Sequence, residues 1–180
     1  MTSSRIEIIL GCMFSGKSTE LLRRCNRYSA IDKKVLLVNH LSDTRTDDSI
    51  KTHRNDRQDA YKTDSLISLI QEDCFKNADI IGIDEAQFFS DLYDFVVIAE
   101  KYNKIIIIAG LDGDFNRKPF GQILNCIPLC DSVEKLSAMD MIDKDGSRAI
   151  FTKRIVNNDE VVLVGSKESY VAVSRKNYIS

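Results

Sequence analysis

The sequence predicts an α/β protein with a parallel sheet flanked by helices and a small β subdomain toward its C-terminal end. Short runs that are apolar throughout, at residues 80–83 and 105–109, are typical of strands buried on both faces of a sheet. Segments with apolar residues at helical spacing separate these runs, which is the pattern of βαβ units. After Met139 the pattern changes to short β-rich segments, which favours a separate small subdomain.

The elements follow one another with short connections. Strands are predicted at residues 6–10, 35–38, 80–83, 105–109 and 133–138, and helices at 17–28, 65–75 and 92–102. Asp64 is the candidate N-cap of the helix at 65–75. Residues 40–63 are almost entirely polar, so we expect a long surface loop there. Residues 120–130, around two prolines, predict a short helix or turn region.

The sequence predicts that the chain is divided into two units. Residues 1–135 form the α/β unit, and residues 136–180 form the small β subdomain. Within the second unit, residues 148–155 and 160–164 are expected to pair as a β-hairpin across the connection 156–159. A polar tail with Tyr170 and Tyr178 is expected to follow.

Composition excludes several classes of protein. The 180 residues carry 25 Lys and Arg against 27 Asp and Glu, a net charge of −2, which argues against binding to nucleic acid. No apolar run approaches the ~20 residues of a membrane span, and no secretory signal opens the chain. The five cysteines are odd in number and lack a CxxC pair, so they indicate neither disulfides nor a zinc site. We expect a cytoplasmic protein without a membrane partner.

A phosphate-binding motif follows the first predicted strand. The residues that match G-x-x-x-x-G-K-[ST] are Gly11, Cys12, Met13, Phe14, Ser15, Gly16, Lys17 and Ser18. The motif opens a predicted helix, whose N-terminal N–H groups attract phosphate. In such loops the lysine, here Lys17, reaches the β- and γ-phosphates, and the hydroxyl, here Ser18, binds Mg²⁺. The fold class is therefore a P-loop NTPase-type sheet, and ATP with Mg²⁺ is the predicted ligand.

Two carboxylates end the strand at residues 80–83. Asp84 has the position of a Walker-B aspartate and is predicted to hold Mg²⁺. Glu85 is the candidate general base, which takes a proton from an attacking hydroxyl in a kinase or from water in an ATPase. The stretch Asp-Glu-Ala-Gln also resembles the DEAx box of helicases, but those enzymes need two ATPase domains and a basic surface. A single, slightly acidic unit does not fit that class.

Longer stretches of the sequence resemble the type II thymidine kinases, the cytosolic and poxvirus-like family. The matching stretches are residues 13–21, 43–45, 52–53, 82–89, 110–115, 117–120, 151–154 and 164–165, followed by Tyr170. They run in the family's order over nearly the whole chain. The resemblance implies transfer of the γ-phosphoryl group of ATP to the 5′-hydroxyl of thymidine, and also to that of deoxyuridine. It further implies a homotetramer that the end product dTTP inhibits.

The resemblance also assigns roles to individual residues. Glu85 matches the family's catalytic base, and Asp43 with Arg45 matches a loop near the nucleoside and phosphates. The residues that match the surroundings of the thymine pocket are Met13, Phe88, Leu111, Phe115 and Phe120. The residues that match the family's lasso, whose backbone binds the pyrimidine edge, are Val161, Val162, Leu163, Val164, Gly165 and Tyr170.

The sequence departs from this family at its zinc site. Family members hold a structural zinc with four cysteines, but the aligned positions here are Asp140, Asp143, Ser174 and Asn177. Zinc sites of this type need thiolate or imidazole ligands, so we expect no structural zinc, with packing and hydrogen bonds in its place. A second departure is Cys12, which stands where the family has proline; a thiol at a helix N-terminus can have a lowered pKa.

Two other classes of function remain open at this level. The first is a single-domain ATPase coupled to nucleic acid or to another partner. The second is a nucleotide-binding module without turnover. Formation of a nucleoside 5′-monophosphate from Mg-ATP distinguishes a kinase from both.

Overall fold

A parallel sheet forms the centre of the molecule. The computed structural model describes residues 4–42, 49–51, 57–155 and 169–180. Within those residues, six strands pair in the order β5-β2-β6-β7-β1-β8, every neighbouring pair being parallel. The strands are β1 (Arg5–Gly11), β2 (Val35–His40), β5 (Tyr61–Thr63), β6 (Ile80–Ile83), β7 (Ile105–Gly110) and β8 (Ser132–Leu136). The predicted α/β fold class with a parallel sheet is confirmed.

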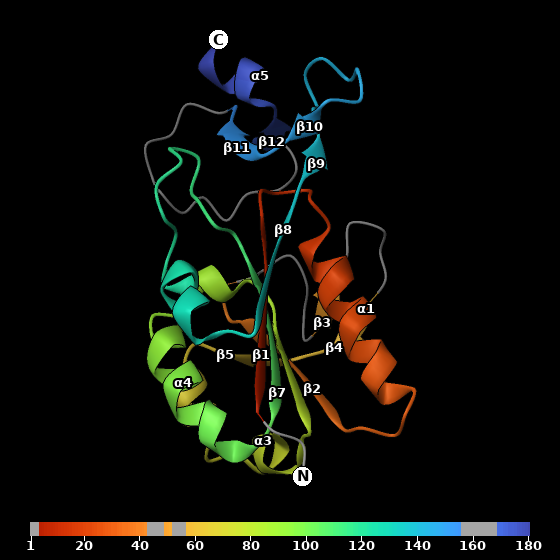
Figure 1. Ribbon diagram of the computed structural model, residues 1–180, viewed down its shortest axis with the longest axis vertical. Coiled ribbons are helices and arrows are strands. Elements are labelled where there is room, and N and C mark those ends of the chain that lie inside the picture. The colour runs from red at the N-terminus through yellow and green to blue at the C-terminus, as the bar shows by residue number, and fades with distance from the viewer. Residues whose placement is uncertain (1–3, 43–48, 52–56, 156–168) are drawn as a thin grey trace.

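Helices cover both faces of this sheet. Figure 1 shows α1 (Lys17–Ser29) on one face and α4 (Leu92–Ala99) on the other. The remaining helices of the second face and its edge are α2 (Leu66–Leu69), α3 (Asp73–Asn77) and the 3₁₀ segments η1 (Ala86–Phe88), η2 (Glu100–Tyr102) and η3 (Ile123–Leu129). Alternation along the strands produces two cores: Ile8 packs toward α4, whereas its neighbour Ile9 packs toward α1. Each such fully buried side chain contributes about 1.5–3 kcal/mol.

The small elements after β8 gather at one end of the molecule (Figure 1). β9 (Ala138–Met139) pairs antiparallel with β10 (Arg148–Ala149), and β11 (Phe151–Arg154) pairs antiparallel with β12 (Tyr170–Val173). α5 (Arg175–Ile179) follows β12. The prediction of a polar tail after the hairpin was wrong, because that stretch contains β12 and α5. The expected hairpin partner at 160–164 lies outside the described residues, and the described partner of β11 is β12.

Two further predictions need correction. Residues 40–63 are not only a loop: β3 (Ser49–Lys51) and β4 (Arg57–Asp59) pair antiparallel, and β5 joins the main sheet beside β2. The helix predicted at 65–75 is split into α2 and α3. Its N-cap is Ser65 rather than Asp64, because the Ser65 hydroxyl accepts a hydrogen bond from the backbone N–H of Ser68.

A buried carboxylate connects the turn after β9 with α5. Asp140 is 2% exposed, and its carboxylate accepts hydrogen bonds from the backbone N–H groups of Ile142, Asp143 and Ser174 at 2.6–2.9 Å. The side-chain amide of Asn177 donates to the same carboxylate. These N–H groups hold the pKa of Asp140 below its ordinary value, and the bond from Ser174 contributes most. The residues at the positions that align with the family's zinc ligands are thus joined to one another by hydrogen bonds.

Two features are absent from the described part of the chain. In the described ranges, no group of three or more His, Cys, Asp or Glu side chains is arranged to hold a metal ion. No helix in the part of the chain that the structure describes is long and apolar enough to cross a membrane.

Candidate active site

The phosphate loop connects β1 to α1. Gly16, the N-cap of α1, has a left-handed backbone with φ of 87°, a conformation that glycine adopts without a steric penalty. Glycine offers no side chain to cap this end of the helix, and the backbone of Phe14 is also left-handed, with φ of 64°. The first N–H groups of the 13-residue helix thus receive no hydrogen-bond acceptor from the side chain of the N-cap residue. Such an N-terminus favours an anion.

Lys17 is buried beneath this loop. Its Nζ donates a 2.7 Å hydrogen bond to the carbonyl of Cys12, within the same loop. Burial lowers the pKa of Lys17, and the nearby carboxylates of Glu85, Asp84 and Asp112 oppose that shift. The fold thus brings the predicted phosphate-loop lysine and the predicted acidic pair close enough to interact electrostatically.

The acidic pair lies at the carboxyl edge of the sheet. In a parallel sheet all strands end at one edge, so Asp84 after β6 and the phosphate loop after β1 share that edge. Asp84 is 3% exposed; its backbone N–H donates to Val38, and its Oδ1 accepts from the N–H of Glu85 at 3.0 Å. The hydroxyl of Ser18 and the carboxylate of Asp84 are hard oxygen ligands, the type that Mg²⁺ prefers. This donor set fits a magnesium ion bound with ATP.

Glu85 occupies an uncommon backbone conformation. Its φ of 50° and ψ of 38° are left-handed, which costs a non-glycine residue roughly 1–2 kcal/mol. Such strain collects at functional sites, where surrounding structure holds it in place. The Glu85 carboxylate Oε2 accepts a 2.6 Å hydrogen bond from the side-chain amide of Gln87. Gln87 also accepts a 2.9 Å bond from the backbone N–H of Leu111, at the end of β7.

Two of the aromatic residues predicted around the thymine pocket, Phe88 and Phe120, contact each other. The rings of Phe88 and Phe120 meet edge to face, with centroids 5.6 Å apart. His40, at the end of β2, lies 5.8 Å from the Phe88 ring. Burial lowers the pKa of His40, which favours a neutral ring. Phe89, the next residue, is completely buried in the core, and its ring lies 4.7 Å from that of His40.

Two further predicted site residues, Phe115 and Tyr170, contact one arginine. The guanidinium carbon of Arg154, on β11, lies 3.9 Å from the centroid of the Phe115 ring. Its Nη2 donates a 2.6 Å hydrogen bond to the hydroxyl of Tyr170 on β12. Tyr178 of α5 adds a 2.7 Å bond from its hydroxyl to the backbone carbonyl of Phe115. Phe115 and Tyr170 are therefore brought together across the two parts of the chain.

The phosphate loop itself contacts the small elements. The backbone N–H of Met13 donates to the hydroxyl of Thr152 at 3.0 Å, and the Cys12 thiol donates to the carbonyl of Ala149. Cys12 is 3% exposed, and this burial raises the pKa of its thiol. The sequence-based idea of a lowered Cys12 pKa is corrected accordingly, because desolvation outweighs the favourable end of the helix.

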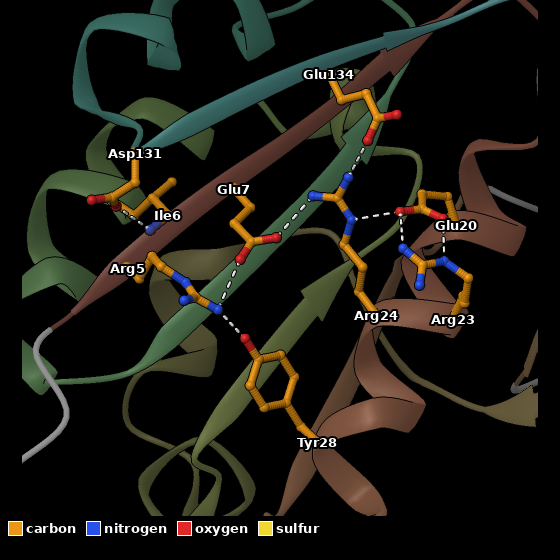
Figure 2. Close-up of polar contacts among 9 residues, drawn as sticks. All are labelled: Arg5, Ile6, Glu7, Glu20, Arg23, Arg24, Tyr28, Asp131 and Glu134. Carbon is orange, nitrogen blue, oxygen red and sulfur yellow. Dashed lines mark hydrogen bonds and ion pairs between the residues drawn. The ribbon is translucent and has the colours of Figure 1, made fainter.

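An ion network fastens the rest of α1 to the sheet (Figure 2). Arg24 contacts Glu20 on its own helix and Glu7 on β1, each at 2.8 Å, and Glu134 on β8. Arg23 also hydrogen-bonds to Glu20 at 2.6 Å, and this bond is the main reason why the pKa of Glu20 falls to about 2. Charges on three elements thus fix the orientation of the helix that starts at the phosphate loop.

Some predicted residues lie outside the described part of the chain. These residues are Asp43, Arg45, Val161, Val162, Leu163, Val164 and Gly165. Other residues at the site were missed by reasoning from the sequence. Gln87, Thr152 and Arg154 each stand inside a stretch that carried the family resemblance, but their contacts depend on tertiary structure.

Comparison with known proteins places the whole chain in one group. A family model described as thymidine kinase matches residues 4–178. A thymidine kinase of raccoon poxvirus is 41% identical over 180 residues, covering 100% of this chain and 99% of its own. One from sheeppox virus is 46% identical over 174 residues, covering 96% of each chain. The cytosolic thymidine kinase of Cricetulus griseus is 42% identical over 177 residues, covering 98% of this chain and 74% of its own.

Proposed function

This chain belongs to the thymidine kinase family, and on that premise we propose that it transfers the γ-phosphoryl group of ATP to the 5′-hydroxyl of thymidine. Deoxyuridine is the expected second substrate. The observation that carries the proposal is that the phosphate loop after β1 and the acidic pair after β6 lie at the same edge of the parallel sheet, where Asp84 and Glu85 act to raise the pKa of buried Lys17. A phosphate-binding group and a candidate base thus lie together at one sheet edge.

The phosphate loop supplies the binding site for ATP. N–H groups of the loop and of the first turn of α1 bind the phosphate oxygens. When ATP binds, Lys17 gives up its hydrogen bond to the Cys12 carbonyl and binds the β- and γ-phosphates instead. Ser18 and Asp84 would hold Mg²⁺, which neutralises charge on the β- and γ-oxygens when it is bound.

Glu85 accepts the proton of the attacking hydroxyl. Its carboxylate is fixed by Gln87 and lies near Lys17, so the base and the phosphate site are part of one arrangement. Thymidine is placed between Phe88, Phe120 and Leu111 on one side and Phe115 with Tyr170 on the other. Met13 completes that pocket from the phosphate loop. We propose that the pocket is closed by Asp43, Arg45 and residues 161–165. Residues 136–180 act as the small subdomain.

One assay tests the proposed function against its alternatives. The protein is incubated with Mg-ATP and each deoxynucleoside in turn, and the products are separated by chromatography. We expect dTMP from thymidine and a smaller yield of dUMP from deoxyuridine. Loss of ATP that DNA stimulates, without a nucleoside monophosphate, would indicate an ATPase. Binding of ATP without either product would indicate a module that lacks turnover.

A substitution tests the role of Glu85. Glu85→Gln keeps the shape of the side chain but removes its basicity, so kcat should fall about 10²–10⁴-fold while ATP binding stays close to normal. Near-normal turnover in this variant would falsify the assignment of Glu85 as the base. Asp73→Asn, a change at an exposed residue of α3, is the control and should leave turnover unchanged.

The proposal includes the assembly, regulation and location of the protein. We expect a homotetramer in sedimentation experiments, and competition by dTTP at the thymidine and phosphate sites. The Cricetulus griseus relative and a human one are both named as cytosolic thymidine kinases, which supports a cytoplasmic location.

A further inference from the structure

We propose that Gln87 is a positioning residue, which holds the Glu85 carboxylate in its reactive orientation and ties it to the backbone at Leu111. This inference rests on the proposed function, because it assigns a partner to the proposed base. Gln87 Nε2 lies 2.6 Å from Glu85 Oε2, and Gln87 Oε1 lies 2.9 Å from the backbone nitrogen of Leu111. A single side chain thus connects the end of β6 to the end of β7.

The chemistry of the amide suits both contacts at once. A glutamine side chain has two N–H donors and one carbonyl acceptor, separated at a planar carbon. Its donor serves the carboxylate of Glu85, and its acceptor serves the N–H of Leu111. A glutamate at the same position could accept from Leu111 but would place a second carboxylate against Glu85. An apolar side chain would serve neither group.

The surroundings of Gln87 are built closely around it. The residue is 3% exposed. A β-carbon at Gly110 would lie 2.8 Å from Gln87 Oε1, and a β-carbon at Gly121 would lie 2.1 Å from the Gln87 carbonyl oxygen. Real β-carbons do not approach other atoms that closely, so glycine at both positions leaves the room that Gln87 occupies. The orientation of the amide is therefore set by packing as well as by its hydrogen bonds.

This contact has a consequence for catalysis. A general base acts only from within hydrogen-bond reach of the proton that it accepts, so the placement of the Glu85 carboxylate affects the rate. The same contact restrains a side chain on a strained backbone, so the base does not swing away from the nucleoside. Leu111 belongs to the proposed thymine pocket, so the position of the base is tied to the wall that binds the nucleoside.

The test compares two isosteric substitutions. Gln87→Glu removes the donor to Glu85 while retaining the acceptor for Leu111. The matched control is Gln122→Glu, which makes the same change at a side chain that accepts from the Tyr93 N–H. We expect kcat for thymidine phosphorylation to fall about tenfold or more in Gln87→Glu while KM for ATP stays near that of the unaltered protein, because the base loses its fixed orientation. In Gln122→Glu, kcat should stay close to that of the unaltered protein.

Additional measurements separate positioning from a purely structural role. Gln87→Met lacks both polar contacts and adds no second carboxylate; its kcat should also fall, but less than that of Gln87→Glu. Thermal melts report folding for each variant, and KM for ATP should stay near that of the unaltered protein. A kcat close to that of the unaltered protein in both variants, whatever their melting temperatures, would overturn the proposal.

A measurement without turnover keeps this inference distinct from the proposed function. The ¹³C-carboxyl resonance of Glu85, assigned by its loss in Glu85→Gln, is compared at one neutral pH in the unaltered protein and in both Gln87 variants. A changed chemical shift and a broader line in the variants support the positioning role, even if the protein forms no dTMP and the proposed reaction fails. Equal shifts and line widths in all three proteins contradict it, even if dTMP is formed.

Discussion

The side-chain nitrogen of Asn177 lies 3.1 Å from each of the two carboxylate oxygens of Asp140. This contact fastens α5 to the turn after β9, and backbone N–H groups of three further residues complete the surroundings of the carboxylate. In relatives of this family, as the resemblance implies, metal ligands stand at both positions. A carboxylate that accepts several N–H bonds can connect chain segments much as a metal ion does.

Asp140→Asn should destabilise the small elements at the end of the molecule. The substitution replaces a charged acceptor by an amide, which presents N–H groups toward the N–H of Ser174 and the amide of Asn177. We expect a melting temperature lower by on the order of 5 °C, measured by circular dichroism. The exposed control Asp73→Asn should melt like the unaltered protein. Equal melting of all three proteins would contradict a stabilising role for Asp140.

Acid should weaken the fold through the same type of group. The pKa of Glu20 is lowered from 4.5 to about 2 in the fold, first by its hydrogen bond with Arg23, and the pKa of Asp140 is also lowered. A carboxyl with a lowered pKa stabilises the fold above its unfolded pKa, and this contribution is lost as the pH falls toward the folded value. Urea unfolding should therefore show falling stability from about pH 4.5 to about pH 2.

The variant Glu20→Gln identifies the helix network as one source of this effect. Its stability should depend less steeply on pH over that same range, because the group that gains a proton is gone. A slope equal to that of the unaltered protein would show that Glu20 does not contribute, and would leave the network in Figure 2 without an electrostatic role in acid unfolding.

Metal analysis should find no structural zinc. The protein is purified, washed with a chelator and measured by atomic emission; the oxygen and amide groups at positions 140, 143, 174 and 177 offer none of the thiolate or imidazole ligands that structural zinc requires. About one zinc ion per chain that is released only on unfolding is the result that contradicts this prediction.

Lys17→Met should separate stability from activity. Burial lowers the pKa of Lys17, so the folded protein disfavours its charged form, and removing that charge relieves a desolvation cost. Without nucleotide, we expect a melting temperature equal to or above that of the unaltered protein. Turnover should fall at least about 10²-fold, because the phosphates lose their fixed cation.

The surface substitution Lys101→Met serves as the control for the Lys17 prediction, because Lys101 is exposed in η2. It should alter neither turnover nor the stabilisation that ATP confers in a melt. Loss of stability in nucleotide-free Lys17→Met, comparable to that of a core substitution, would show instead that the bond from Lys17 to the Cys12 carbonyl supports the loop.

The sequence predicted the strands whose residues are buried on both faces of the sheet. β6 and β7 are buried on both faces, so their unbroken apolar runs were sufficient, and β6 was predicted with its observed bounds. The strand β5, with Tyr61 exposed and, among the described strands, β2 alone beside it, has no such signal. β12 was missed because Tyr170–Val173 is short and its neighbours are polar.

The site shows the same contrast. Features built from residues adjacent in the chain were predicted, and contacts between residues far apart in the chain were not. The phosphate loop and the acidic pair depend on residues that are adjacent in the chain, so motif spacing was enough to predict them. Gln87 stands in a recognised stretch, but its bond to Leu111 joins residues 24 positions apart. The contact of Met13 with Thr152 spans 139 positions. No periodicity carries information about contacts of that kind.

The two contacts between the phosphate loop and the small elements have a thermodynamic consequence. Met13 and Cys12 each donate from the loop to β11 or its approach, at Thr152 and Ala149. A ligand that moves the phosphate loop alters these two hydrogen bonds, and so alters the free energy of the small elements that accept them. The same holds in reverse for a ligand that moves the small elements. By linkage, any gain in ATP affinity that follows occupation of the nucleoside side must be matched by an equal gain in nucleoside affinity when ATP binds first. Whatever coupling between the two substrates these bonds transmit is therefore equal in both directions.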